Sequence, residues 1–130
     1  MAYNPNADFN RDEIRQKFDQ LVIFAAQNKA SDIFINTDNY VSVKLYGKMT
    51  YLKNVYMNEQ DVYNLIHTIA REAGFHEFLK TSELNFMVDV ENTTYLRVNA
   101  YRQRGMPGLV MRLIPNVIPD LDELNLPQSV

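Results

Sequence analysis

The residues with the clearest capacity for chemistry are the arginines of one short segment, YLRVNAYRQRGMPGLVMR, which runs from Tyr95 to Arg112. No Asp or Glu occurs anywhere in residues 92–119, so this stretch carries a charge of +4. The other 102 residues hold all 16 acidic and nine of the 13 basic residues, and carry −7. Guanidinium groups stay charged, and their fork of donors matches phosphate oxygens. The segment is therefore a candidate anion-binding element, and its candidates are Arg97, Arg102, Arg104 and Arg112.

Two strands joined by a turn are predicted to position these arginines. Apolar residues alternate on both sides of Gly105-Met106-Pro107-Gly108, where two glycines and a proline indicate the turn. Successive side chains of a strand point to opposite faces. Alternation puts one set on a core face, Leu96, Val98 and Ala100, and another on the face that can meet an anion, Arg97, Asn99 and Tyr101.

The rest of the chain predicts two helices and further strands. Asn10 and Asn58 are expected N-caps, and Gly74 is the expected stop of the second helix, followed by a short helix at 75–79. Strands are predicted at 31–35, 41–45, 49–53 and 84–90, and a one-turn helix at 120–124. The buried face of the second helix is predicted to be Val62, Leu65, Ile66, Ile69 and Ala73.

This order of elements predicts an α+β fold: a mostly antiparallel sheet of about six strands, with helices packed on one face. Residues 1–9 are expected to be a flexible leader and 10–130 one domain. The abrupt end suggests a piece cut at a domain boundary. No signal-like start and no apolar run of about 20 residues occurs, so a cytoplasmic domain is expected.

Other chemistry is scarce. The chain has no cysteine, which excludes disulfides, thiolate zinc sites and cysteine nucleophiles. His67 and His76 lack a second histidine or a carboxylate at ligand-like spacing, so they are read as ordinary surface or helix-end residues, and no metal site is expected. No phosphate-binding loop motif occurs. The net charge of −3 argues against nucleic-acid binding driven by bulk charge.

Three interpretations of the arginine segment remain open from the residues alone. In the first, Arg97 and Arg112 are cross-strand neighbours that pair with acids elsewhere. In the second, they meet a phosphate of a nucleotide or a nucleic acid. In the third, Tyr95, Tyr101 and the arginines form a stacking platform for single-stranded RNA.

Six short runs follow one another between Lys29 and Pro127. They are Ala30-Ser31-Asp32-Ile33, Lys44-Leu45-Tyr46-Gly47, Leu96-Arg97-Val98-Asn99-Ala100-Tyr101, Gln103-Arg104-Gly105, Val110-Met111-Arg112-Leu113-Ile114-Pro115 and, near the end, Ile118-Pro119-Asp120-Leu121-Asp122-Glu123-Leu124-Asn125-Leu126-Pro127. Together and in this order, these runs resemble the N-terminal domain of the PilT/PilU family of type IV pilus retraction ATPases, which are related to secretion ATPases of the GspE kind.

Two departures from the family pattern look more like PilU than PilT. Phe34 stands where the family often has histidine, and Glu83-Leu84-Asn85-Phe86 replaces an acidic E-x-D. Tyr95 occupies the position of the first arginine in the common R-F-R, so one positive charge is missing. Arg102 falls at a variable family position.

The resemblance implies a PAS-like domain beside a RecA-like ATPase domain in a homohexamer, with ATP and Mg²⁺ bound by the full-length protein. It implies that Arg97, Arg104 and Arg112 contact nucleotide phosphates or a neighbouring subunit. The Walker motifs would lie beyond Val130, so this piece alone is expected to be inactive and to bind no cofactor tightly. Expected partners are its own RecA-like domain, neighbouring subunits, a paralogous retraction ATPase and the inner-membrane platform protein, with no nucleic acid. The alternative is a non-enzymatic PAS-like module that binds a ligand or partner.

Overall fold

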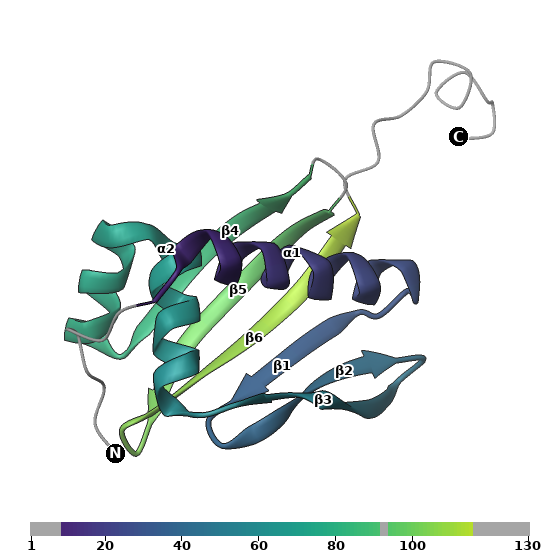
Figure 1. Cartoon of the computed structure of the whole chain (residues 1–130), viewed down its shortest axis with the longest axis horizontal. Helices are drawn as coiled ribbons and strands as arrows, with labels where there is room; N and C mark the ends of the chain where they lie inside the picture. The colour runs from purple at the N-terminus through teal and green to yellow at the C-terminus, as the bar shows by residue number, and fades with distance from the viewer. Residues whose placement is uncertain (1–8, 92–93, 116–130) are drawn as a thin grey trace.

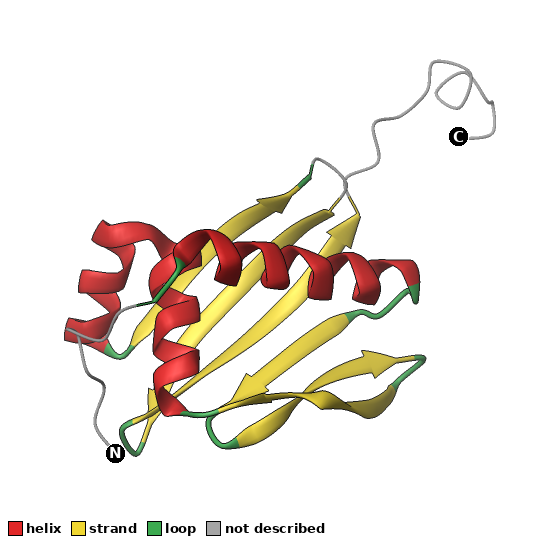
Figure 2. Ribbon diagram, in the orientation of Figure 1, coloured by secondary structure: helices red, strands yellow, loops and turns green. Residues whose placement is uncertain are grey.

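The chain folds into one six-stranded antiparallel sheet with two helices on one face (Figures 1 and 2). The computed structural model describes residues 9–91 and 94–115. Its elements are α1 (Arg11–Gln27), β1 (Asp32–Asn36), β2 (Asn39–Leu45), β3 (Lys48–Met57), α2 (Glu59–Thr81), β4 (Glu83–Val90), β5 (Thr94–Gln103) and β6 (Met106–Pro115). The strands lie in the order β3-β2-β1-β6-β5-β4. The predicted α+β class is confirmed, while the helix predicted at 120–124 lies outside the described residues.

Both predicted helix starts are confirmed. The Asn10 side chain accepts a hydrogen bond from the Glu13 amide at 3.0 Å and caps α1. At α2, Asn58 Oδ1 accepts from the Asp61 amide at 2.9 Å, and the Asp61 carboxylate accepts from the Asn58 amide at 3.0 Å. Each cap satisfies amides that the first turn of a helix leaves without a partner.

The predicted stop of the second helix at Gly74 is wrong. The helical conformation breaks earlier, at Arg71, whose φ of 65° and ψ of 175° lie outside the helical region, and a helix then resumes to Thr81. Because the break shifts the helix phase, Ala73 is exposed and not buried as predicted. Gly74 permits close packing instead, since an added Cβ would lie 3.3 Å from the Ala70 side chain and 3.4 Å from that of Leu84.

The predicted arginine hairpin is confirmed by the pairing of β5 with β6, but its turn lies earlier than the predicted Gly105-Met106-Pro107-Gly108. The turn consists of Arg104 and Gly105, both with positive φ (57° and 80°), and β6 already begins at the next residue. Two residues with positive φ form the turn that matches the twist of paired strands. Gly108 therefore belongs to β6, where the Tyr101 ring lies so close that an added Cβ would be 2.7 Å from it.

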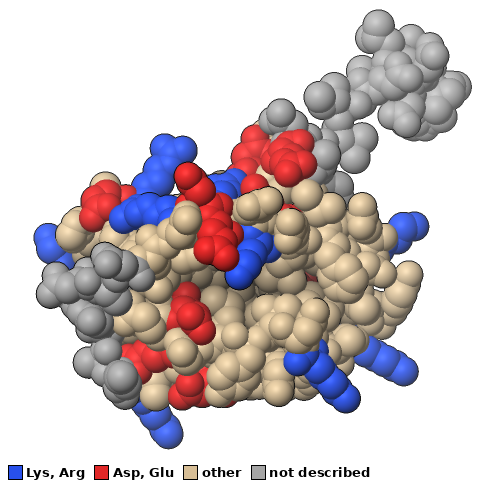
Figure 3. Space-filling view, viewed as in Figure 1, with Lys and Arg blue, Asp and Glu red and all other residues tan. Residues whose placement is uncertain are grey.

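The hydrophobic core lies between the sheet and the two helices. The predicted core face of β5 is confirmed, because Leu96, Val98 and Ala100 are buried. Helix-side partners include Phe18, Val22, Val62, Ile66, Phe75 and Phe78. Seen from the helix side, acidic and basic side chains intermix on the surface (Figure 3). None of the helices in the described part of the chain is long and apolar enough to cross a membrane.

Candidate functional site

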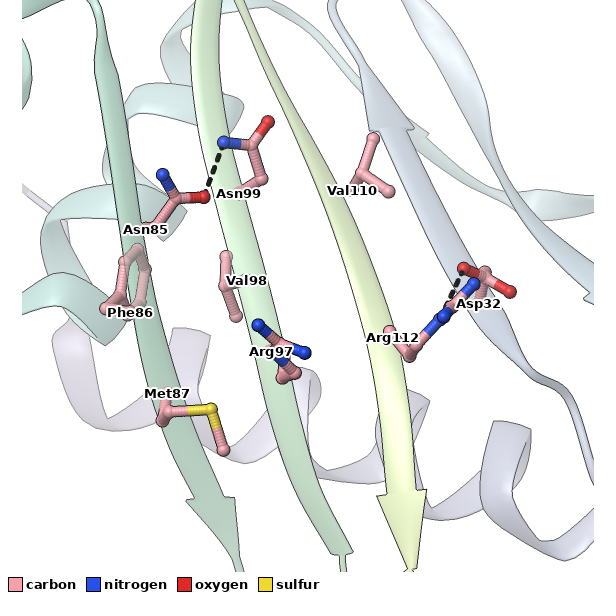
Figure 4. A pocket seen from close by; sticks show the side chains of 9 residues that line it. All are labelled: Asp32, Asn85, Phe86, Met87, Arg97, Val98, Asn99, Val110 and Arg112. Carbon is pink, nitrogen blue, oxygen red and sulfur yellow. Dashed lines mark hydrogen bonds and ion pairs between the residues drawn. The ribbon is translucent and has the colours of Figure 1, made fainter.

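The candidate site is a row of side chains on the sheet face away from the helices, here called the open face. Strand register places Lys44 opposite Asp32, Asp32 opposite Arg112, and Arg112 opposite Arg97. Met87 follows on β4. The row thus crosses five strands, from β2 to β4. In order, its side chains are positive, negative, positive, positive and, at Met87, apolar. Figure 4 views this face, with the helices behind the strands.

Arg97 and Arg112 form the centre of the row. They are direct cross-strand neighbours, as one of the sequence interpretations holds. Like charges placed opposite each other destabilise a sheet, so the pair calls for a compensating anion. Arg97 is exposed and has no ion pair within the described residues, and the Arg112 side chain is 69% exposed. Two exposed guanidinium groups on one surface can offer a fork of donors to phosphate or carboxylate oxygens.

Asp32 is the acid nearest to the pair. Its carboxylate oxygen lies 3.7 Å from Arg112 Nε, beyond hydrogen-bond length, and its side chain is only 12% exposed. The interpretation that both arginines pair with acids therefore holds loosely for Arg112 and, among the described residues, not for Arg97.

A shallow depression of about 490 Å³ lies over this part of the open face (Figure 4). Next to the arginine pair, it is lined by two amides from adjacent strands. Asn99 Nδ2 donates to Asn85 Oδ1 at 2.8 Å and lies 3.4 Å from a Glu83 carboxylate oxygen. Amide groups beside guanidinium groups give the depression polar donors and acceptors without adding charge.

Arg104 lies apart from this row. It occupies the β5–β6 turn, seven residues along β5 from Arg97. At ~3.3 Å per residue, the two backbones are roughly 23 Å apart. The structure thus brings two of the three predicted site arginines together and leaves the third at the other end of the hairpin.

Arg102, which the family pattern leaves variable, ties β5 to the end of α2. Its Nη2 donates to the Leu79 carbonyl at 2.7 Å, and its Nε donates to Ser82 Oγ at 3.1 Å. Its guanidinium also lies over the Phe78 ring, 5.6 Å from the centroid. Carbonyls at a helix C-terminus lack helical partners and favour a cation. Arg102 therefore has a structural role that the sequence does not reveal.

The two tyrosines of the proposed stacking platform differ. Tyr95 is 37% exposed on the open face. The Tyr101 ring instead covers Gly108, and its hydroxyl donates to Asn36 Oδ1 at 2.9 Å. Burial raises the pKa of Tyr101 above its ordinary value. A ring held in this way already uses one face within the chain, which weakens the platform interpretation.

His67 is not the ordinary surface residue that the sequence predicts. Its ring stacks on Phe75 with centroids 4.2 Å apart, and its Nε2 lies 3.0 Å from a Glu72 oxygen and 2.9 Å from Arg11 Nη2. His76 lies 3.4 Å from the other Glu72 oxygen. The hydrogen bond with His67, followed by the charges of His67 and Arg11, lowers the pKa of Glu72. No group of three metal-ligating side chains occurs within residues 9–91 and 94–115.

Comparison with known proteins finds relatives among pilus ATPases. The chain is 27% identical over 112 residues to the type IV pilus ATPase PilU of Pseudomonas aeruginosa, covering 86% of this chain and 29% of PilU. It is 25% identical over 107 residues to the retraction ATPase PilT of the same organism, covering 82% of this chain and 31% of PilT. The chain is homologous to PilU and PilT.

The structural comparison agrees with the homology to PilT. The crystal structure of the pilus retraction motor PilT with bound ADP matches at a TM-score of 0.70, over 85% of this chain and 33% of that one, at 23% identity. This likeness shows a shared fold. The chain spans less than a third of the length of PilU and PilT. No protein-family model matches it.

Two residues of the row, Asp32 and Lys44, are not among the site residues predicted from the sequence. Both lie in runs that resemble the PilT/PilU family, Ala30-Ser31-Asp32-Ile33 and Lys44-Leu45-Tyr46-Gly47. The signal that could have found them is alternation, because Ile33 and Val43 are buried and their neighbours must face the other side. Their alignment with the arginines depends on β1 pairing with β6, which no local pattern specifies.

Proposed function

We propose that the chain is the N-terminal domain of a cytoplasmic hexameric ATPase that powers type IV pilus retraction, and with it twitching motility and DNA uptake. Homology to PilU and PilT over more than four-fifths of the chain supports the motor class. The ADP bound in the PilT crystal structure supports nucleotide binding by the parent protein. In this proposal Mg²⁺ and ATP bind to a RecA-like domain outside these 130 residues, and the present chain supplies no Walker motif.

The role that we propose for this domain rests on the Arg97–Arg112 pair. The pair is exposed on an open face that no described element covers, and one of its members has no acidic partner there. We propose that, in the assembled motor, this arginine pair contacts the nucleotide phosphates or the ATPase domain next to them. Arginines placed there stabilise charge on the transferred phosphoryl group and respond to its loss.

Arg104 receives a separate role at the other end of the hairpin. Its distance from the pair, roughly 23 Å along the strand, is too large for one phosphate group to bridge. We assign it to a contact between subunits of the homohexamer. The remaining proposed partners are a paralogous retraction ATPase and the inner-membrane platform protein of the pilus machine.

The test uses the full-length parent protein. Arg97→Ala and Arg112→Ala should each lower kcat for ATP hydrolysis by about tenfold or more without loss of assembly, as expected when a group that stabilises transition-state charge is removed. Arg104→Ala should weaken assembly, measured by light scattering, more than it lowers turnover per assembled subunit.

Lys48→Ala is the matched control, since it removes a cation from the opposite side of the sheet, where Lys48 lies across from Leu45, the residue after Lys44 of the row. It should leave turnover unchanged. Wild-type turnover and assembly in both Arg97→Ala and Arg112→Ala would exclude the nucleotide role of the pair.

A further inference from the structure

The open-face row contains an acid, Asp32, that can compete with a bound anion for Arg112. Asp32 is the sole acid of the row, and it lies between Lys44 on one side and Arg112 on the other. Its carboxylate is largely buried, yet its partner Arg112 Nε stands 3.7 Å away and no closer donor reaches it among the described residues. A buried carboxylate needs a cation, so Arg112 cannot leave Asp32 without a replacement.

Lys44 is placed to be that replacement. It is the direct cross-strand neighbour of Asp32 on β2, and its ammonium has no ion pair within the described residues. Side chains directly opposite in an antiparallel pair have Cβ atoms about 5 Å apart, well within reach of a lysine stem. Arg112 is mostly exposed, so its guanidinium can turn from Asp32 toward Arg97.

We propose that anion binding at the open face works by ion-pair exchange along this row. An anion with two or more oxygens bridges Arg97 and Arg112, Arg112 leaves Asp32, and Lys44 takes its place beside the carboxylate. The inference rests on the proposed function, because it regulates the same arginine pair. It makes Asp32 and Lys44 positioning residues that set anion affinity without touching the anion.

The geometry separates this exchange from simple charge attraction. Lys44 lies two strands from Arg112 and three from Arg97, so its backbone is roughly 10 and 14 Å away. Both distances exceed the Debye length of ~8 Å at an ionic strength of ~0.15 M, so the direct interaction of Lys44 with an anion at the arginine pair is weak there. An effect of Lys44 on anion affinity must therefore act mainly through Asp32, and it should vanish once Asp32 is neutral.

The experiment is a double-mutant cycle on the 130-residue chain with inorganic pyrophosphate as the probe. Affinity is read from the ¹⁵N-detected arginine Nε–H resonances at fixed ionic strength. Asp32→Asn should tighten pyrophosphate binding by about threefold, and Lys44→Gln should weaken it by about threefold, as for a partly exposed ion pair. In the Asp32→Asn background, Lys44→Gln should have no effect.

Lys48→Gln is the matched control for loss of one positive charge and should leave affinity unchanged. If Asp32→Asn does not fold, judged by circular dichroism, the comparison of Lys44→Gln with Lys48→Gln decides. The exchange would be overturned if Lys44→Gln and Lys48→Gln changed pyrophosphate affinity equally. It would also be overturned if Lys44→Gln weakened binding as much in the Asp32→Asn background as in the wild-type chain.

Failure of the exchange and failure of the proposed site give different results. If Arg112→Ala abolishes pyrophosphate binding while Asp32→Asn and Lys44→Gln leave it unchanged, the exchange is wrong and the phosphate site stands. If Arg112→Ala leaves binding unchanged, or the wild-type chain shows no pyrophosphate-dependent shift at Arg97 and Arg112, the exchange is wrong and the phosphate role of the pair loses its support.

Discussion

Replacing Arg102 by alanine should destabilise this domain far more than replacing any other arginine of the hairpin. The Nη2 hydrogen bond to the Leu79 carbonyl, at 2.7 Å, joins a charged donor to the last turn of α2. A hydrogen bond from a charged group contributes ~1.5–3 kcal/mol. The contact over the Phe78 ring adds ~0.5–1 kcal/mol. Because Arg102 is only half-buried, we expect a total loss of about 2–3 kcal/mol in the free energy of unfolding.

The assay is urea and thermal unfolding followed by circular dichroism. For a domain of this size, the loss corresponds to a decrease in Tm of roughly 8–12 °C. Arg97→Ala is the matched control, because it removes the same side chain from the same strand at a position that has no ion-pair partner among the described residues. It should change the free energy of unfolding by less than ~0.5 kcal/mol. Arg102→Lys should lie between the two, since one ammonium cannot reproduce the fork.

Equal stability of Arg102→Ala and Arg97→Ala would contradict a structural role of Arg102. It would mean that the contacts of the Arg102 guanidinium with the carbonyl, the hydroxyl and the ring stabilise the fold no more than its contacts with water stabilise the unfolded chain. A large loss in both variants would show that Arg97 has a structural role as well, which would weaken its assignment to the functional site.

Three further predictions concern the same fold. Gly108→Ala should cost ~1–3 kcal/mol through the clash with the Tyr101 ring, and the cost should largely disappear in a Tyr101→Ala background, as urea unfolding of the four proteins will show. Because folding lowers the pKa of Glu72, its ionised carboxylate stabilises the folded state. This stabilisation is full above the ordinary pKa of 4.5 and is lost as pH falls through the lower pKa of the folded state. Glu72→Gln should therefore flatten the pH dependence of Tm below about pH 4.5. Asn58→Ala should lower the free energy of unfolding by ~1 kcal/mol through loss of the α2 cap, measured in urea.

Local signals predicted much of the fold. The caps at Asn10 and Asn58 are right because an N-cap depends on residues three apart in sequence. The alternation that buries Leu96 and exposes Arg97 is right for the same reason, since it depends on strand geometry alone.

The errors arise where tertiary contacts override local preference. Pro107 and Gly108 look like turn residues, but both belong to β6, and the absence of a side chain at position 108 leaves room for a ring from the neighbouring strand. The break at Arg71 replaces the expected stop at Gly74, whose role is close packing instead. The contacts of Arg102 join positions 20 or more residues apart, so no local pattern could reveal them.

The candidate site was predicted in part. The charge segregation and the alternation indicate Arg97 and Arg112, and the structure places them side by side on an open face. It separates Arg104 from them, because the turn is two residues long and Arg104 forms half of it. Asp32 and Lys44 align with the pair because β1 lies between β2 and β6, an arrangement that no local sequence pattern specifies.

The contact between the arginine pair and bound nucleotide is tested most directly by arginine-selective labelling of the full-length parent with phenylglyoxal, quantified by mass spectrometry with and without a non-hydrolysable ATP analogue. Arg71, exposed on the helix side of the domain, is the internal control. We expect the analogue to reduce labelling of Arg97 and Arg112 severalfold and to leave Arg71 unchanged. Equal labelling of Arg97 and Arg112 in both states would contradict the assignment of this pair to the nucleotide-dependent contact.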